Sequence, residues 1–286
     1  MRPAPLEGLE PTLNQRTLSI IGPGRAGTAI AKALANKGWI ISRVAGRSVE
    51  HARLLAERLG AEACSGADVG ISVGLVVIST PDAAITETAQ IVAGKAEPGT
   101  LLIHLAGAFG VEAFEGVSAL RPDLILGSIH PLQTLSDENA FERLQGAYCA
   151  IDGAPETRDI ALEIGLKPFF VLPENRVGYH AAAVVASNHL VALMGQVERL
   201  AKSAGVPFEA FFPLSRAALD AALITGPKNA LTGPVSRGDL QTIEEHLAFM
   251  ASLEGNSSEV DSYKALARAA LRLTGRNDPA LEELLS

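Results

Sequence analysis

Two short apolar runs end in histidines, and these are the side chains with the clearest chemistry. The runs read "LLIH" and "ILGSIHP" and contain His104 and His130. Imidazole holds and releases a proton near neutral pH, so it suits the protonation of an alkoxide that develops when a carbonyl accepts a hydride. We expect His130 to be the proton donor. His104 is the second choice, because it could be buried in its strand and hydrogen-bonded there.

A second group of polar residues lies in one helical stretch, "NRVGYHAAAVVASNHLVAL". At about 100° per residue, His180, Val184 and Ser187 share a face, and Asn188 lies about 80° from His180. His189 points the opposite way and is interpreted as structural. His180 and Asn188 are therefore candidate catalytic residues, and Ser187 is a candidate substrate ligand. The alternative for His180 is a polar residue satisfied at a helix interface.

The loop "GPKNALTGPVSRGD" brings further polar side chains together between two glycine–proline pairs. Polar residues on a rigid loop beside a cleft suit recognition of a carboxylate. We expect Lys228 and Arg237 to hold such a substrate, together with Gln133 of "GSIHPLQT". The alternatives are that Lys228 is a solvated charge and that Asp239 is the N-cap of the next helix.

Three glycines spaced as G-x-G-x-x-G lie in "LSIIGPGRAGTAIAKALANKG", between an apolar run and an alanine-rich helical pattern. In this context Gly22 permits a tight turn, Gly24 lets the backbone approach a pyrophosphate, and Gly27 permits close packing of helix on strand. The helix N-terminus offers free N–H groups and a partial positive charge to phosphates. The pattern predicts a dinucleotide-binding turn, with a turn that binds nothing as the alternative. The other residues of this turn are Pro23, Arg25 and Ala26.

The residues after the second apolar run indicate which dinucleotide is bound. Turns that bind NAD place Asp or Glu about 20 residues on, to hold the ribose 2′-hydroxyl, whereas this chain reads "VAGRSVEHAR". A guanidinium such as that of Arg47 attracts a 2′-phosphate, which a carboxylate would repel. Ser48 and Arg25 could add to this site, so NADP(H) is favoured over NAD(H), unless Arg47 is an ordinary surface residue. The remaining expected cofactor contacts lie at later strand ends: Thr80, Pro81 and Ala106.

Strand-like and helical patterns alternate through the first part of the chain. Apolar runs predict strands at 18–22, 39–45, 75–79, 100–105, 124–129, 147–151 and 168–172. Helical patterns cover 25–37, 49–59, 83–93 and 155–164, the third of which Asp82 could cap. The alternation predicts an α/β fold, a doubly wound parallel sheet of the Rossmann type over residues 17–173. Its carboxyl edge would bring the candidate strand-end residues together.

The rest of the chain reads as helix alone. Helical patterns cover 176–203, 207–223, 239–253 and 258–274, which predicts an all-helical domain over residues 174–286. The first of these patterns would span about 42 Å, too long for a helix that covers a small α/β domain. Residues 1–16 contain three prolines and no apolar segment of the signal-peptide kind, so we expect a flexible tail there.

Composition narrows the class of protein. The chain has 286 residues, of which 48% are hydrophobic and 20% charged, and a net charge of -8, which argues against a nucleic-acid-binding surface. Cys64 and Cys149 lie in no CxxC pair and at no metal-ligand spacing, so we expect free thiols, a reducing compartment and no metal site. No stretch approaches the roughly 20 uninterrupted apolar residues of a membrane span. We therefore expect a cytoplasmic protein that binds no membrane.

Three motifs in order, "GSIHPLQT", "YHAAAVVASNHLVAL" and "TGPVSRGD", resemble a bacterial family that joins a Rossmann-like domain to a C-terminal helical domain of unknown function. That family lies within the 6-phosphogluconate dehydrogenase and β-hydroxyacid dehydrogenase-like superfamily, with ketopantoate reductase, pyrroline-5-carboxylate reductase and prephenate dehydrogenase as relatives. The resemblance implies a Rossmann domain followed by a 6-phosphogluconate dehydrogenase C-terminal-like domain. It also implies NADP(H) as cofactor, a homodimer formed through the helical domain, and ketopantoate as one substrate to test.

The catalytic residues of these relatives match the chain unevenly. The "IHP" at 129–131 is similar to the His-Pro of prephenate dehydrogenases, whose histidine acts on the substrate hydroxyl, and this supports His130. In β-hydroxyacid dehydrogenases the long helix carries a catalytic lysine four residues before an asparagine. If Asn188 matches that asparagine, the lysine position falls on Val184. The proton donor is then His130 alone, or His180 in the role of the lysine.

The function expected from these residues is that of an oxidoreductase transferring a hydride from NADPH to a small keto acid or imine. We expect this substrate to carry a carboxylate. The absent lysine favours an alternative, a non-catalytic protein that senses NADP(H) and acts through a partner. A third interpretation is a scaffold with an inactive nucleotide site.

Overall fold

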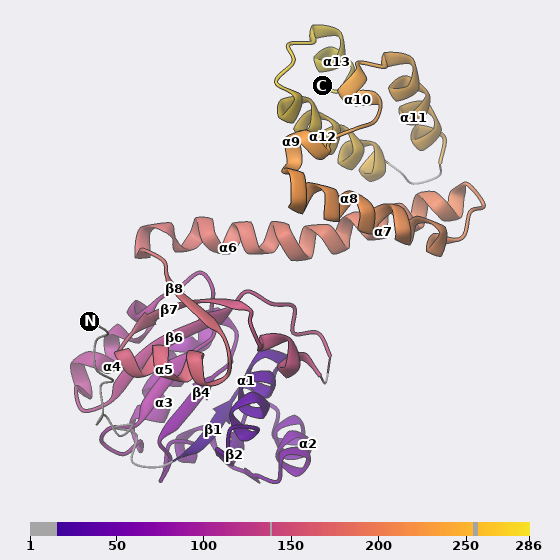
Figure 1. Ribbon diagram of the computed structural model, residues 1–286. Helices are drawn as coiled ribbons and strands as arrows, with labels where there is room; N and C mark the ends of the chain where they lie inside the picture. The colour runs from indigo at the N-terminus through magenta and orange to yellow at the C-terminus, as the bar shows by residue number, and fades with distance from the viewer. Residues whose placement is uncertain (1–15, 138, 254–256) are drawn as a thin grey trace, which may run out of the picture. The chain divides into compact units, whose positions relative to one another are not determined.

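The computed structural model describes residues 16–137, 139–253 and 257–286 (Figure 1). By compactness the chain divides into two units, one ending at Ser187 and the other spanning Asn188–Ser286. The first unit holds a sheet and its covering helices, and the second is helical. The domain boundary expected at 173/174 stays a prediction. The tail expected at 1–16 lies outside the described residues, except for Arg16.

An eight-stranded sheet forms the first unit, in the order β3-β2-β1-β4-β5-β6-β7-β8. The order along the chain reverses between β1 and β4, and ligands of doubly wound sheets bind outside the carboxyl ends of the strands at such a point. The expected α/β doubly wound fold is confirmed. The strands are β1 (Thr17–Ile21), β2 (Ile40–Ala45), β3 (Glu62–Ala63), β4 (Leu75–Ile78), β5 (Leu101–His104), β6 (Ile125–Pro131), β7 (Tyr148–Gly153) and β8 (Lys167–Phe170).

Two strands, β7 and β8, depart from the expected all-parallel sheet. β7 pairs antiparallel with β6, so that His130 lies opposite Ala150, whereas β8 returns parallel to β7. A parallel partner for β6 would require a crossover connection, usually through an α-helix. The described residues between β6 and β7 contain only a 3-10 turn, Ala140–Leu144. β7 therefore lies beside β6 in the opposite direction.

Helices cover both faces of this sheet (Figure 1). Side chains from α1 (Arg25–Ala35) and α5 (Pro155–Glu163) share one core with the sheet, and α2 (Val49–Leu59) packs beside it on β2. The other core contains α3 (Ile85–Ala93) and α4 (Glu115–Leu120). In β4, Leu75 and Val77 point into the first core, and Val76 and Ile78 into the second. A strand covered on both faces reads as a continuous apolar run.

In the first unit, α2 has the end residues that its sequence favours, whereas the start of α3 differs from the prediction. The Ser48 hydroxyl accepts a hydrogen bond from His51 N at the start of α2, and Gly60 ends that helix with φ 66°. The expected cap by Asp82 is wrong: this residue begins a 3-10 turn, and α3 starts at Ile85 after an Ala84 that provides no side-chain cap. Other 3-10 turns span Gly66–Asp68, Val111–Phe114, Pro173–Asn175 and Phe208–Phe211.

The second unit packs around a small core of its own that includes Ile243, Leu271 and Leu281. Asp239 caps α11, because its carboxylate accepts a hydrogen bond from Thr242 N, as one interpretation of the sequence allowed. The helices after α6 (Arg176–Val184) are α7 (Leu190–Ser203), α8 (Phe212–Thr225), α9 (Pro227–Ala230), α10 (Pro234–Arg237), α11 (Leu240–Ser252), α12 (Ser257–Thr274) and α13 (Pro279–Leu284).

A π-helical turn, Val185–His189, joins α6 to α7. The sequence predicts one regular helix over 176–203, but π-helical hydrogen bonds run from i to i+5 and rotate the faces of all residues that follow. The 80° angle expected between His180 and Asn188 therefore does not apply, because it assumes regular α-helical spacing across this turn.

Within the described ranges, the stretch Pro173–Ser203 is long and apolar enough to cross a membrane. This is weak evidence for a span. The side chain of Arg176 at its start is fully buried, and Tyr179 is hydrogen-bonded to His130. These polar contacts attach the start of the stretch to the sheet of the first unit.

Candidate functional site

The glycine turn connects β1 to α1, and each of its three glycines has a distinct environment. Gly22 has a φ of +94°, and a Cβ there would lie 2.4 Å from the carbonyl oxygen of Ser79. A Cβ on Gly27 would lie 2.7 Å from Ser79 Cβ, and the Gly27 N–H donates to Ser79 Oγ over 3.0 Å. The nearest atoms to a Cβ on Gly24 are 3.8 Å away. The turn thus has one glycine with a positive φ, one that is tightly packed and one that is open, as a dinucleotide turn requires.

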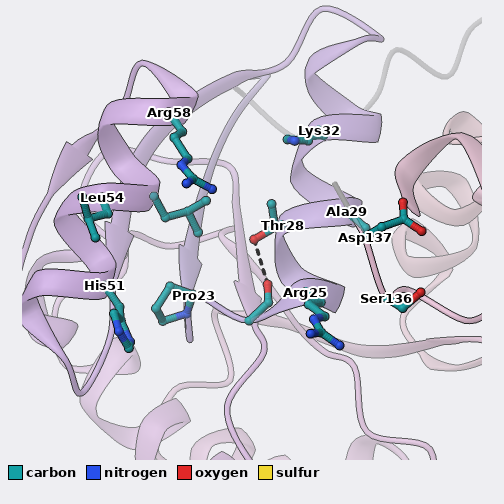
Figure 2. A pocket seen from close by; sticks show the side chains of 12 residues that line it. Pro23, Arg25, Thr28, Ala29, Lys32, His51, Leu54, Arg58, Ser136 and Asp137 are labelled. Atoms are coloured by element: carbon teal, nitrogen blue, oxygen red, sulfur yellow. Dashed lines mark hydrogen bonds between the residues drawn. The ribbon is translucent and has the colours of Figure 1, made fainter. Parts of the chain in front are cut away.

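A cavity of about 760 Å³ adjoins this turn between α1 and α2 (Figure 2). Asp137 lines it from the segment after β6 and is paired with Arg143. In Figure 2, two of the basic side chains lie near Pro23 and two toward the other end of the helices. A lining with more positive than negative charge suits a phosphate-bearing ligand. The basic residues of the cavity are Arg25, Lys32, His51 and Arg58.

Arg47 and Ser48 follow β2 at the place expected for a 2′-phosphate site, and both are exposed. The Ser48 hydroxyl is engaged as the cap of α2. Arg47 is not among the residues that line the cavity, whereas His51 and Arg58 of α2 are. A Cβ on Gly46 would lie 2.5 Å from Pro23 Cδ, so the turn after β2 packs directly on the glycine turn. The sequence analysis did not single out His51 and Arg58 of α2, although their i, i+7 spacing places them on one helix face.

The strand-end residues expected to lie near the nicotinamide occupy the carboxyl ends of β4 and β5. Thr80 follows β4, and its Oγ1 is buried without a hydrogen-bond partner among the described residues. Pro81 is exposed, and Ala106 is 7% exposed. A buried hydroxyl without a partner is rare in folded proteins, so Thr80 fits a site completed by a bound ligand.

The candidate acid–base cluster lies at the carboxyl end of β6. His130 Nδ1 is 2.7 Å from Tyr179 Oη of α6, and the ring centroids of His130 and His180 are 5.6 Å apart. A Cβ on Gly107 would lie 2.4 Å from His180 Nδ1 and 2.8 Å from His130 Nε2. Both imidazoles therefore approach the same point above Gly107, which is possible because that residue has no side chain.

Burial and neighbouring charges decide the protonation of this cluster. Burial, with the nearby His180 and Arg176 next in weight, lowers the pKa of His130 to about 4. Burial raises the pKa of Tyr179 to about 12. His130 is therefore neutral at pH 7, and Tyr179 keeps its proton.

His104, the second candidate proton donor, is fully buried at the end of β5. Its Nε2 is 2.8 Å from the Gly110 carbonyl oxygen, and its Nδ1 accepts a hydrogen bond from Ala106 N. Burial lowers its pKa. Because both ring nitrogens bind the backbone, His104 holds the loop 105–110 in place and is a structural histidine.

Arg176, which the sequence interpretation did not single out, fastens α6 to the sheet. Its guanidinium donates to the carbonyl oxygens of Phe109, at 2.6 Å, and Ile151, at 3.3 Å. Its Nη2 also lies 3.9 Å from the Asp152 carboxylate. The signal was present in the sequence: Arg176, Tyr179 and His180 have the i, i+3, i+4 spacing of a single helix face.

The remaining predicted residues lie away from this cluster or in the second unit. The Ser187 hydroxyl donates to the Ala183 carbonyl oxygen within its own helix, and the Gln133 amide donates to the Arg143 carbonyl oxygen. Asn188, Lys228 and Arg237 are exposed residues of the second unit, so their roles stay predictions. Among the described residues, no group of three or more His, Cys, Asp or Glu is arranged to hold a metal ion.

Two family models match the chain. Residues 6–131 match a Rossmann-like domain, and residues 147–270 match a domain of unknown function, DUF2520. No curated protein matches. The chain thus combines a Rossmann-like domain with a C-terminal DUF2520 domain, as the sequence motifs indicate.

Solved structures match over nearly the whole chain. One from Bacteroides fragilis, described as a candidate NADP oxidoreductase, is 27% identical, covers 91% of this chain and 99% of its own, and has a TM-score of 0.80. A protein from Thermotoga maritima is also 27% identical over 91% of this chain and 100% of its own, with a TM-score of 0.64. An imine reductase from Myxococcus stipitatus in complex with NADP+ shares the fold at 18% identity, covering 94% and 100% of the two chains, with a TM-score of 0.60.

Proposed function

We propose that this chain, in which a Rossmann-like domain precedes a DUF2520 domain, is an NADP-dependent oxidoreductase that reduces a small carbonyl or imine substrate. The observation that carries the proposal is the position of the His130–Tyr179–His180 cluster. It lies at the carboxyl end of β6, and β1, which leads into the glycine turn, points to the same edge of the sheet. A reacting group and a dinucleotide would meet at this edge.

The cofactor assignment rests on how the residues present would hold a dinucleotide. The open Gly24 allows a pyrophosphate to approach the backbone, and the Thr80 hydroxyl lacks a partner among the described residues. The basic lining of the α1–α2 cavity and Arg47 favour a 2′-phosphate over a free hydroxyl. When bound, NADPH supplies a hydride. The similarity to a structure described as a candidate NADP oxidoreductase, and the fold shared with an imine reductase in complex with NADP+, support this choice.

The role of the protein's own residues follows from their protonation. His130 is neutral and half-buried, so it acts as a hydrogen-bond donor to the oxygen or nitrogen of the reacting double bond. A neutral imidazole in a water-poor site stabilises developing negative charge without first losing hydration. His180, on the other side of Gly107, limits the position of the reacting group.

The substrate class that we propose includes both ketones and imines. The relatives with known ligands in this fold include an imine reductase and reductive aminases, which favours a ketone or imine. We propose a carboxylate-bearing substrate, ketopantoate among those to test, held by Gln133, Ser187, Lys228 or Arg237, with Asn188 as a further polar contact.

We also propose that a second copy of the chain packs against the helical unit. Large apolar side chains of α7 and α8 are exposed: Val191 is 71% exposed, Leu214 66%, Leu223 76% and Ile224 81%. Apolar surface of this kind marks interfaces in soluble proteins. Light scattering after gel filtration should give a dimer in the wild type and a monomer in Leu223→Asp; a wild-type monomer at micromolar concentration contradicts the dimer. The two free thiols fit a cytoplasmic location.

The cofactor test is a fluorescence titration with NADPH and NADH. We expect NADPH to bind more tightly than NADH, and Arg47→Asp to reduce this preference by about tenfold or more, since it replaces attraction to a phosphate with repulsion. Equal affinities for the two nucleotides contradict the NADP assignment, and binding of neither contradicts the enzyme assignment altogether.

The catalytic test is turnover of keto acids and imines by wild type and His130→Ala. We expect the variant to bind NADPH normally and to lose about 10²-fold or more in kcat. If the protein binds NADPH but no substrate in the panel oxidises it, and if His130→Ala leaves its cellular function intact, the protein is a sensor of NADP(H) rather than a reductase.

A further inference from the structure

We propose that Tyr179 is a positioning residue whose hydroxyl holds His130 in the tautomer that carries its proton on Nε2. The nitrogen with the proton then faces His180 Nδ1 across Gly107. The tautomer is a property of the protein without substrate. Its catalytic consequence rests on the proposed function.

The first support is the direction of the hydrogen bond between the two rings. Tyr179 Oη lies 2.7 Å from His130 Nδ1, and the rings meet edge to face with centroids 5.5 Å apart. A second contact of Tyr179 Oη, to the His130 carbonyl oxygen, is 3.5 Å long. Burial raises the pKa of Tyr179 to about 12, so the phenol keeps its proton and has it to donate. Because the contact with Nδ1 is much the shorter of the two, we assign the phenol proton to His130 Nδ1.

The second support comes from the other side of the imidazole. His180 Nδ1 is buried and has no hydrogen-bond partner in the described part of the chain. His130 Nε2 and His180 Nδ1 face the same point above Gly107. When His180 has its lone pair at Nδ1, a proton on Nδ1 of His130 would leave two nitrogen lone pairs facing each other in a buried place, which is unfavourable. A proton on Nε2 of His130 removes this conflict.

The contrast with His104 shows why only one of these histidines is available for chemistry. His104 also has its proton on Nε2, because that nitrogen faces a carbonyl oxygen, but this proton is committed to the backbone. In His130 the tyrosine engages Nδ1 alone. Its Nε2 has no hydrogen bond to any described residue, since the bonds of this ring all involve Nδ1.

The arrangement also provides a route for proton recovery. If the Nε2 proton passes to a substrate oxygen or nitrogen after the hydride has reached its carbon, His130 takes the phenol proton at Nδ1. Water then gives a proton to Nε2, leaving hydroxide in the solvent, and Nδ1 returns its proton to the phenolate, so that atoms and charges balance and the starting tautomer is restored. Tyr179 acts through His130 throughout and does not itself touch the substrate.

The test is nitrogen NMR of histidine-labelled protein without substrate, for the wild type and Tyr179→Phe. Tyr263→Phe is a matched control: Tyr263 Oη lies 2.9 Å from His246 Nδ1 in the second unit, with ring centroids 5.8 Å apart. We expect His130 to carry its proton on Nε2 in the wild type and to become a mixture of tautomers in Tyr179→Phe. Tyr263→Phe should change the His246 signals and leave those of His130 unchanged.

A proton on Nδ1 of His130 in the wild type overturns the proposal, and so does an unchanged tautomer in Tyr179→Phe. If a substrate is found, Tyr179→Phe should lower kcat about tenfold, near the value of one lost hydrogen bond, with little change in NADPH binding. A shifted tautomer in a protein that reduces no substrate supports the positioning role and contradicts only the proposed function, so the two failures are distinguishable.

Discussion

Replacing Gly107 by alanine tests whether the two imidazoles must meet above this residue. The added Cβ would lie 2.4 Å from His180 Nδ1 and 2.8 Å from His130 Nε2, closer than nonbonded atoms approach. Each ring must withdraw by about 1 Å to restore ordinary van der Waals contact at about 3.5 Å. A misplacement of about 1 Å in catalytic groups costs about 10²-fold in rate. We therefore expect kcat of Gly107→Ala to fall about 10²-fold.

The fold should survive this change. Gly107 does not have a positive φ, so alanine fits its backbone, and the atoms it meets are the ends of side chains. We expect a loss in the free energy of unfolding of about 1 kcal/mol, the lower end of the cost of overpacking. Nicotinamide fluorescence measures NADPH binding, which should be unchanged, and NADPH oxidation measures kcat.

Gly178→Ala is the matched control, because Gly178 lies in α6 next to Tyr179 and nothing is found within 4 Å of a Cβ at that position. Alanine is the better helix former by about 1 kcal/mol, so this variant should be as active as the wild type and slightly more stable. Undiminished turnover in Gly107→Ala, or an equal loss in both variants, would refute the reasoning from contact distances.

Three further predictions concern stability. Gly22→Ala should lose more than about 2 kcal/mol in denaturant unfolding and bind NADPH weakly, because φ is +94° and the Cβ meets backbone; a loss below about 0.5 kcal/mol would contradict this. Arg176→Met removes buried hydrogen bonds to the Phe109 and Ile151 carbonyl oxygens together with the ion-pair partner of Asp152, and should cost about 3 kcal/mol. Arg53→Met, at an exposed ion pair, should cost less than about 1 kcal/mol; similar losses in the two would disprove the distinction. Finally, the lowered pKa of His130, about 4 when folded, means that the unfolded state takes up the proton first, so unfolding free energy should fall as pH drops from about 6.5 to 4, by up to about 3 kcal/mol. His130→Gln should flatten this slope, and an unaltered slope in that variant would assign the effect to other groups.

The sequence predicts the elements of the first unit well because its strands are covered on both faces. The short run Leu75–Ile78 is continuously apolar and rich in β-branched residues, which favours a buried strand. The spacing of Gly22, Gly24 and Gly27 predicts the turn, in which Gly22 has a positive φ and Gly27 is closely packed. Two local errors have local causes. The expected Asp82 cap is absent because Asp82 begins a 3-10 turn. β7 runs antiparallel to β6 because the described residues of their connection contain no crossover helix.

In the candidate site, the sequence predicted individual residues but not which residues contact one another. His130 could be chosen from its type and its place at a strand end. Its hydrogen-bond partner Tyr179 lies 49 residues further along the chain. Gly107 follows the neighbouring strand β5. No regular spacing along the sequence relates these residues to His130. The π turn at Val185–His189 further changed which residues share a face with His180.

Periodicity and residue type therefore determined the fold class and the glycine turn, and they predict His130 as the proton donor, because each depends on local backbone preference or on the chemistry of a single side chain. Only the tertiary structure decided which histidine is structural, which tyrosine binds the other, and why a buried Arg176 lies beside them. Burial and the approach of side chains from β5, β6 and α6 set protonation and tautomer, and those quantities exist only once the chain has packed.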